Sequence, residues 1–246
     1  MSEFTAGIII IGDEILSGRT QDTNSNFLAK KLTESGIQLK EIIVIPDNEE
    51  IIINTVKRYY NSFTYVFTTG GIGPTHDDIT SESISKAFNK KYKIHAEAFK
   101  ILQNFYPKGE FNESRQRMAK MPEGASLIPN PLTIAPGFII KNVFVLPGVP
   151  EIMKNMINYV FQNIEKGNPK KIFTINTNLF ESTLADNLTI IQKRHPECSI
   201  GSYPYFNYIA KTGGVNIVVS SWKLENLDNI IKEIKDSILL LGGKII

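Results

Sequence analysis

Apolar residues in the first half of the chain form two kinds of pattern. Short continuous runs, rich in β-branched residues, end in polar turns, which is typical of strands covered on both faces. They span residues 7–11, 41–45 and 65–67. Between them, residues 27–32 and 49–60 place apolar side chains at helical spacing. The pattern therefore predicts the order β-α-β-α-β, which favours a mostly parallel sheet with right-handed crossovers and helices on both faces.

Polar residues predict where these helices begin. Asn24 or Ser25 is a suitable N-cap for the first helix, and Asp47 or Asn48 for the second. Residues 95–121 are expected to be helical and more polar, with a break at residues 107–109. The second part of this region carries three cations, which either reach a ligand phosphate or lie on a solvated helix face. They are Arg115, Arg117 and Lys120.

The second half of the chain predicts a further strand, a helix and a second domain. Prolines separate the apolar runs 126–128 and 137–140, which indicates a hairpin or a rigid surface loop. Residues 143–146 predict a strand that ends at Pro147-Gly148-Val149-Pro150, before an amphipathic helix. A polar segment at 165–171 predicts a linker, so we expect domains at 1–167 and 168–246.

The second domain is expected to be a small α+β domain. Its pattern gives the order β-α-β-β-α, which resembles half of a ferredoxin-like sandwich. The last strand is expected either near residues 208–211 or directly at 215–221.

Composition narrows the possible partners and location. The net charge of +2 gives no broad field that would attract nucleic acid. A single cysteine, Cys198, excludes an internal disulfide and a cysteine-rich zinc site. The first residues contain no basic n-region, and the apolar run 8–11 is too short for a signal or membrane segment. We therefore expect a cytoplasmic protein with no membrane partner.

The stretch with the most chemical information is Thr68-Thr69-Gly70-Gly71-Ile72-Gly73-Pro74-Thr75-His76-Asp77-Asp78-Ile79-Thr80. It lacks the lysine of a Walker loop, and its glycine spacing is not that of a dinucleotide-binding turn. Its small residues allow backbone N–H groups to approach a phosphate, and Asp77 with Asp78 can hold Mg²⁺. A purely structural tight turn is the alternative, because glycine clusters commonly mark turns.

Acidic residues follow four separate predicted strands, and parallel strands would bring them to one edge of the sheet. Each alone also suits an N-cap. Together they indicate a metal-assisted phosphoryl or pyrophosphoryl site. They are Asp13, Glu14, Asp47, Asp77, Asp78 and Glu151.

Three motifs resemble the molybdopterin-binding domain of CinA-like (competence/damage-inducible protein A) proteins. They are Gly12-Asp13-Glu14-Ile15-Leu16-Ser17-Gly18 with the following Asp22-Thr23-Asn24, the stretch 68–80, and Leu146-Pro147-Gly148-Val149-Pro150. The similarity covers roughly residues 4–165, and the small domain resembles the short second region of the family. Related molybdenum-cofactor biosynthesis proteins, which adenylylate molybdopterin, share the Thr-Gly-Gly-x-Gly-Pro core.

The resemblance implies a three-layer α/β/α domain that binds a phosphate-bearing pterin, such as molybdopterin, or a nucleotide. It also implies a pyrophosphatase of ADP-ribose type that depends on a divalent metal, Mg²⁺ or Co²⁺, and a homo-oligomer. The alternatives are a molybdopterin- or nucleotide-binding protein without hydrolase activity and a non-enzymatic oligomeric scaffold.

The resemblance also implies residue roles. Asp47 and Asp78 match the catalytic carboxylates, and Asp77 and Asp78 would hold the metal. The expected ligand and phosphate contacts are Gly12, Asp13, Glu14, Asn24, Thr69, Gly70, Gly71, Gly73, Pro74, Thr75, Thr80 and Gly148.

The chain departs from the family pattern in three ways. Glu151 comes one residue early in the proline-glycine turn, and residues 130–138 lack a Gly-Thr pair that many relatives carry. The sequence also lacks the separate amidase domain of many relatives, so we do not expect nicotinamide mononucleotide deamidase activity.

Overall fold

The structure is a computed structural model that describes residues 4–207, 212–222 and 226–246. These residues fall into two compact units, the larger ending at Gly167 and the smaller beginning at Asn168. A strand near residues 208–211, one of two alternatives expected from the sequence, lies outside the described residues.

The larger unit is built on a six-stranded sheet in the order β2-β1-β3-β8-β7-β6. The first four strands are parallel, and β7 pairs antiparallel with both of its neighbours, β8 and β6. The hairpin expected across the proline-marked loop is confirmed by the pairing of β6 with β7. The strands are β1 Phe4–Ile11, β2 Ile37–Ile45, β3 Tyr65–Thr69, β6 Ser126–Ile128, β7 Gly137–Ile140 and β8 Val143–Leu146.

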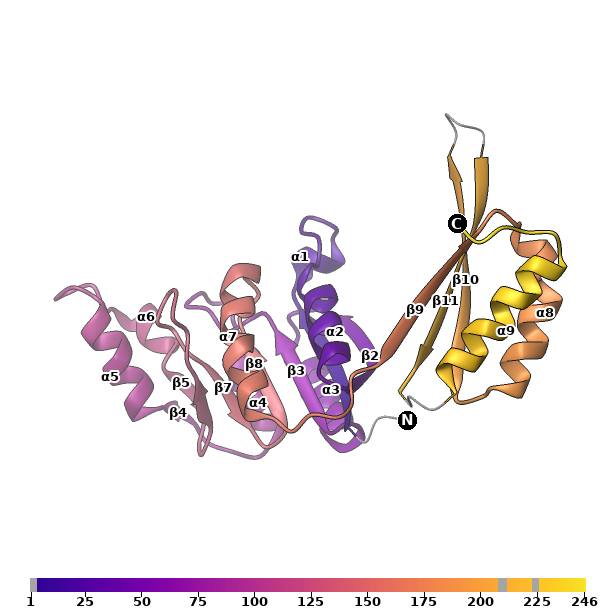
Figure 1. The fold of residues 1–246 in the computed structure, drawn as a ribbon. Helices are drawn as coiled ribbons and strands as arrows, with labels where there is room; N and C mark the ends of the chain where they lie inside the picture. The colour runs from indigo at the N-terminus through magenta and orange to yellow at the C-terminus, as the bar shows by residue number, and fades with distance from the viewer. Residues whose placement is uncertain (1–3, 208–211, 223–225) are drawn as a thin grey trace. The chain divides into compact units, whose positions relative to one another are not determined.

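Helices cover both faces of this sheet, so the predicted three-layer α/β/α architecture is confirmed (Figure 1). Side chains of β1 alternate between the two cores: Ile8 and Ile10 pack with α2 and α7, and Ile9 and Ile11 with α3 and α4. This alternation explains why β1 is a continuous apolar run. The helices are α2 Asn24–Glu34, α3 Glu49–Ser62, α4 Thr80–Ala87 and α7 Pro150–Asn163, and a short helix, α1 Asp13–Leu16, follows β1.

The N-terminal caps correct one expectation and refine another. Neither Asn24 nor Ser25 caps α2 with its side chain; the Asp22 carboxylate accepts from the N–H groups of both, at 2.9 and 3.2 Å. An Asp just before the helix satisfies these free donors, so the Asn24 side chain is available elsewhere. For α3 the capping residue is Asn48, which accepts from the N–H of Ile51 at 3.1 Å. Asp47 therefore does not serve as a cap.

Residues 88–122 form a small extension, in which the predicted second helix is wrong beyond Arg117. Residues 120–122 instead form a strand that pairs antiparallel with residues 92–94. Pro122 favours an extended conformation at Met121, and extended geometry buries the Met121 side chain in the core. The extension contains β4 Tyr92–Ile94, α5 Ala96–Phe105, α6 Glu113–Arg117 and β5 Lys120–Pro122.

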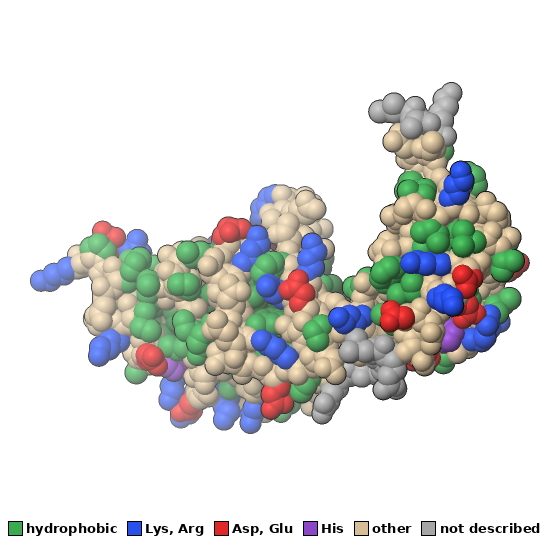
Figure 2. Space-filling view, viewed as in Figure 1, with side chains coloured by type: hydrophobic (Ala, Val, Ile, Leu, Met, Phe, Trp, Pro, Cys, Tyr) green, Lys and Arg blue, Asp and Glu red, His purple; other side chains and the backbone are tan. Residues whose placement is uncertain are grey.

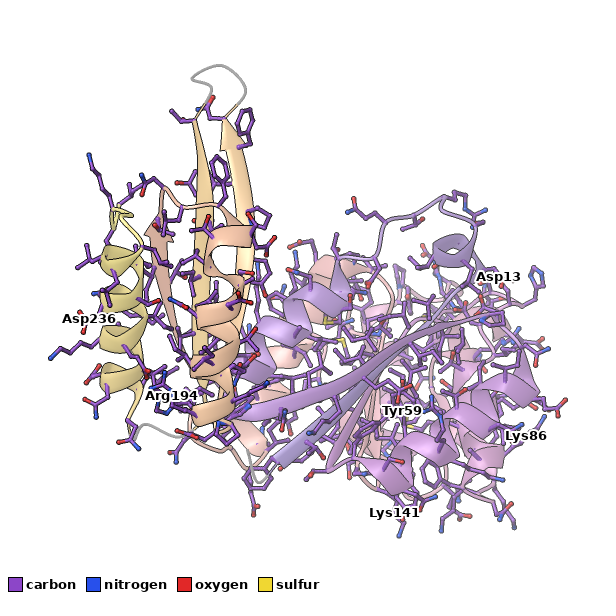
Figure 3. All side chains as sticks on the ribbon, turned by 90° about the vertical axis from the view of Figure 1, so that its right-hand side faces the viewer. Asp13, Tyr59, Lys86, Lys141, Arg194 and Asp236 are labelled. Carbon is purple, nitrogen blue, oxygen red and sulfur yellow. The ribbon has the colours of Figure 1, made fainter. Side chains whose placement is uncertain are left out.

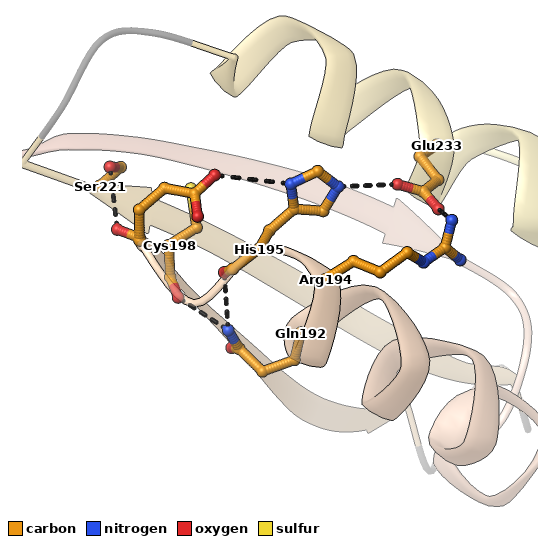
Figure 4. Close-up of polar contacts among 7 residues, drawn as sticks. Gln192, Arg194, His195, Cys198, Ser221 and Glu233 are labelled. Carbon is orange, nitrogen blue, oxygen red and sulfur yellow. Dashed lines mark hydrogen bonds and ion pairs between the residues drawn. The ribbon is translucent and has the colours of Figure 1, made fainter.

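The smaller unit has the predicted β-α-β-β-α order. Its antiparallel sheet has the strand order β10-β11-β9. Figure 4 shows a polar network in this unit, where His195 lies between Glu197, at 3.5 Å, and Glu233, at 3.0 Å, and Arg194 pairs with Glu233. The elements are β9 Lys171–Thr177, α8 Glu181–Arg194, β10 Cys198–Asn207, β11 Thr212–Ser221 and α9 Leu227–Leu240.

Candidate functional site

The carboxyl ends of the four parallel strands meet at one edge of the large sheet. The N–H of Gly12 donates to the carbonyl of Ile45 at 3.1 Å, which joins the turns after β1 and β2. The N–H of Gly70 donates to the carbonyl of Leu146 at 3.1 Å, which joins the turns after β3 and β8. This is the edge at which open α/β sheets bind ligands.

Asp47 lies at this edge within electrostatic reach of three other carboxylates, those of Asp13, Glu14 and Asp77. The backbone N–H of Asp13 donates to the Asp47 carboxylate at 3.0 Å. Burial raises the pKa of Asp47, and the charges of Asp13, Glu14 and Asp77 raise it further, although the hydrogen bond from Asp13 opposes the shift. Figure 3 shows Asp13 at the outer edge of the larger unit. A carboxyl with a raised pKa among other carboxylates is a candidate for acid-base chemistry.

The glycine loop needs glycine because it passes directly between β1 and α4. Gly70 has φ 108°, and a Cβ there would lie 2.0 Å from the carbonyl oxygen of Ile11. A Cβ on Gly71, at φ 66°, would lie 2.2 Å from the hydroxyl oxygen of Thr80. The N–H of Thr80 also donates to the carbonyl of Gly71 at 3.0 Å, so the loop is held against the start of α4.

Asp78 braces this loop rather than joining the cluster around Asp47. Its carboxylate accepts from the N–H of Thr75 at 2.8 Å and from the Thr75 hydroxyl at 2.5 Å. It lies against Gly73, where a Cβ would come within 2.7 Å of it. The charge of Asp78 acts on Tyr92, whose pKa is raised chiefly by burial. The two adjacent aspartates therefore act on different groups: the charge of Asp77 raises the pKa of Asp47, and that of Asp78 raises the pKa of Tyr92.

A small cavity of about 50 Å³ lies beside the carboxylates, with Glu14, Asn24, Thr69 and Gly148 in its wall. The Asn24 amide nitrogen donates to the carbonyl of Gly148 at 2.8 Å. The Asn24 side-chain oxygen and the Thr69 hydroxyl are buried, at 5% and 1% exposure, and make no hydrogen bond within the described part of the chain. Buried polar atoms of this kind call for a partner, so the cavity is suited to a ligand with hydrogen-bonding groups.

The remaining predicted residues lie in other places. Pro74 is half-buried on the loop, while Thr75, His76 and Asp77 are exposed. Glu151 is exposed and pairs with Lys154 at 2.8 Å, away from the carboxylate cluster.

Metal binding at this edge stays a prediction. Within the described ranges, no three or more His, Cys, Asp or Glu side chains are grouped so that they could hold a metal ion. Mg²⁺ commonly binds through one or two carboxylates together with water and substrate phosphates. Asp77, one of the two predicted ligands, would need such further ligands.

Sequence reasoning missed the role of Tyr92. This residue lies in a three-residue strand, too short to predict from periodicity, and the charge of Asp78 acts on its pKa only in the folded chain.

Cations and carboxylates are interspersed over the face seen in Figure 2. Among the helices of the described residues, none has the length and apolar content needed to cross a membrane.

Comparison with known proteins identifies the domain that the sequence motifs indicate. Residues 7–166 match a family described as "probable molybdopterin binding domain", and residues 172–239 match one described as "FAD synthase, middle domain". A protein of Archaeoglobus fulgidus is 37% identical, covering 93% of this chain and 96% of its own length. A protein of Sulfurisphaera tokodaii is 31% identical, covering 100% and 99%.

A solved structure gives a further match over the larger unit. The protein CinA with unknown function from Thermoplasma acidophilum is 32% identical, with a TM-score of 0.63, and the match covers 66% of this chain and 99% of that protein. The family match extends over most of the chain, and the motifs that carry the resemblance lie together at one sheet edge. The chain therefore belongs to the CinA-like family of proteins built on a molybdopterin-binding domain.

Proposed function

We propose that this sheet edge binds ADP-ribose or a similar nucleotide diphosphate and hydrolyses its diphosphate bond with the help of Mg²⁺ or Co²⁺. The observation that supports this most is the position of Asp47. Its half-buried carboxylate is held by the N–H of Asp13 and lies among three other carboxylates that raise its pKa.

The glycine loop and the small cavity supply the binding groups. Glycines at 70, 71 and 73 leave the loop backbone without side chains, so its N–H groups can approach a phosphate closely. The unpaired Asn24 oxygen and Thr69 hydroxyl suit the hydroxyl groups of a ribose. The turn after β3 would then hold the phosphates, and the small cavity would receive hydroxyl groups of the sugar.

The chemistry assigned to the chain is proton transfer and orientation. As a water oxygen bonds to one phosphorus, its proton passes to the Asp47 carboxylate, and the bond from that phosphorus to the bridging oxygen breaks. The products are AMP and ribose phosphate, and the leaving phosphate regains a proton from Asp47 or solvent. A divalent cation bound by Asp77, with water and the substrate phosphates as its other ligands, would neutralise the charge of the diphosphate. Asp78 positions the loop through Thr75.

A second candidate is binding of a pterin or nucleotide without turnover. The observation that favours it is the engagement of Asp78 with Thr75, which leaves that carboxylate less available for chemistry. A scaffold without a ligand would bind neither class of compound. We also propose that the protein forms a homo-oligomer. Sedimentation velocity of the purified protein would test this independently.

The direct test is product analysis. Purified protein is incubated with ADP-ribose and a panel of dinucleotides, with Mg²⁺, with Co²⁺ and with chelator. We expect metal-dependent release of AMP, loss of that release in Asp47→Asn, and normal release in Asp186→Asn, an exposed carboxylate of the smaller unit. Binding of a pterin or nucleotide without cleavage would favour the second candidate.

A further inference from the structure

A larger cavity lies beside the first turn of α4, the helix that follows the glycine loop. Its volume is about 630 Å³, which is within the usual range for small-molecule sites. Its wall is formed by residues of α4, β4, α6 and β5. The polar residues that matter here are Glu82, Tyr92, Glu113, Gln116, Arg117 and Lys120.

Two cations on this wall have no counter-ion. Throughout the described ranges, no carboxylate lies within ion-pair distance of Arg117 or Lys120, and both side chains are only half-exposed. Arg115, two residues away from Arg117, is different. It pairs with Glu110 at 3.0 Å and stacks on the Tyr106 ring at 4.3 Å, and it does not line the cavity. In this fold, Arg115 is therefore engaged in structural contacts, whereas Arg117 is available to bind a ligand.

The two available cations come from different elements. Had residues 112–121 formed one helix, Arg117 and Lys120 would be neighbours on a solvated face. Instead Arg117 ends α6 and Lys120 begins β5, so both border the same concave surface. Two cations that converge on a cavity are suited to an anionic group.

The acidic residues of the cavity do not cancel this charge. Glu82 pairs with Lys86 at 3.0 Å, outside the cavity wall. Glu113 is exposed at the start of α6 and forms no ion pair with Arg117 or Lys120. An anion bound at the two cations would therefore gain charge complementarity that the protein itself does not provide.

The cavity borders the first turn of α4, the helix against which the glycine loop is held. Glu82 on the cavity wall lies in that turn, two residues after Thr80, and the N–H of Thr80 donates to the carbonyl of Gly71 at 3.0 Å. The cavity therefore begins close to the end of the glycine loop.

We propose that Arg117 and Lys120 bind a phosphate group of the ligand held at the glycine loop, which is one of the two phosphates of a nucleotide diphosphate or the phosphate of a phosphorylated pterin. This inference rests on the proposed function for the position of that ligand, but not on its hydrolysis. Phosphate is the shared chemistry of a nucleotide and a phosphorylated pterin. Arg117 and Lys120 are binding residues that set affinity for the phosphate-bearing ligand, and they take no part in proton transfer.

Calorimetric titration of three variants tests this assignment. ADP-ribose, ADP, a phosphorylated pterin and uncharged adenosine are titrated into wild type, Arg117→Gln, Lys120→Gln and the control Arg115→Gln. We expect the first two variants to lose about tenfold in affinity for the phosphate-bearing ligands and to show a weaker salt dependence. Adenosine binding should not change, and Arg115→Gln should keep its affinity while unfolding at a lower temperature.

The outcomes separate this inference from the proposed function. Equal affinities of wild type, Arg117→Gln and Lys120→Gln would overturn the inference, even in a protein that cleaves ADP-ribose. Failure of wild type to bind any phosphate-bearing ligand would overturn both. Binding that depends on Arg117 without any cleavage would sustain the inference and overturn the hydrolase, and the ligand that binds more tightly would identify nucleotide or pterin as the source of the phosphate.

Discussion

The backbone N–H of Asp13 donates a hydrogen bond to the carboxylate of Asp47 at 3.0 Å. This bond ties the turn after β1 to the turn after β2, across 34 residues of sequence. It also opposes the effects of burial and neighbouring charge on Asp47, which nevertheless prevail and raise its pKa. Asp47 thus lies in an environment that disfavours its charge, and this supports the proposal that it takes part in proton transfer.

Replacing Asp47 with Asn should stabilise the protein at neutral pH. Its pKa in the folded protein is above the ordinary value of 3.8, so folding costs free energy when the group is ionised. The cost is absent below pH 3.8, grows as pH rises through the folded pKa, and then stays constant. The Asn oxygen can still accept from Asp13. Calorimetric melting temperatures of the two proteins should differ at neutral pH and converge in acid.

The matched control for this stability effect is Asp186→Asn. Asp186 is exposed on α8, far from the cluster in sequence, and its replacement should leave the melting temperature unchanged at every pH. A lower melting temperature for Asp47→Asn than for wild type at neutral pH would contradict the account of Asp47.

Replacing Gly70 with Ala should cost more stability than the same change at Gly124. Both glycines have positive φ, 108° and 84°, so each substitution carries a backbone penalty of about 1 kcal/mol. Only at Gly70 does the new Cβ meet a backbone carbonyl, that of Ile11. Denaturant unfolding should therefore show a loss of about 1 kcal/mol for Gly124→Ala and roughly 3 kcal/mol for Gly70→Ala. Similar losses at the two positions would mean that the loop moves away from β1 easily.

Thr69→Val should weaken ligand binding without weakening the fold. The Thr69 hydroxyl is buried and unpaired in the described structure, so its removal should stabilise the free protein or leave it unchanged, within about 1 kcal/mol. A ligand hydroxyl at the small cavity would lose one partner, and its affinity should fall about fivefold, or roughly 1 kcal/mol.

Thr68→Val is the internal control for that substitution. Its hydroxyl is also buried without a partner, but successive strand residues point to opposite faces, and Thr68 does not line the small cavity. Titration of ADP-ribose should distinguish Thr69→Val from Thr68→Val. Equal affinities for the two variants would remove the small cavity from the proposed site.

Asp78→Ala should lower stability, whereas Asp78→Asn should largely retain it. Alanine removes the acceptor for both the N–H and the hydroxyl of Thr75, at a cost of roughly 1–3 kcal/mol, while the Asn oxygen can still accept from the N–H. Hydrogen exchange of the loop amides, followed by mass spectrometry, should show faster exchange in the Ala variant alone. Equal protection in both variants would show that Asp78 does not brace the loop.

The order of elements was predictable because the parallel strands contain short apolar runs, and in β1 Ile8 to Ile11 are buried on alternate faces. The extension was harder to predict, since Lys120 and Met121 carry no helical or alternating signal long enough to distinguish strand from helix. The acidic strand ends were visible in sequence, and the charges of Asp13, Glu14 and Asp77 do act on Asp47 in the fold. The hydrogen bonds by which Asp78 holds Thr75 were not predictable, because spacing alone does not reveal them.

We propose Asp47 as the proton acceptor in a metal-dependent cleavage of a nucleotide diphosphate. The most direct test is the pH dependence of ADP-ribose hydrolysis, measured with Mg²⁺ or Co²⁺ for wild type and Asp47→Asn. The account predicts a wild-type rate that rises as Asp47 loses its proton, with no such rise and a rate at least about a hundredfold lower in Asp47→Asn. A variant that hydrolyses ADP-ribose as fast as wild type, with the same pH profile, would contradict it.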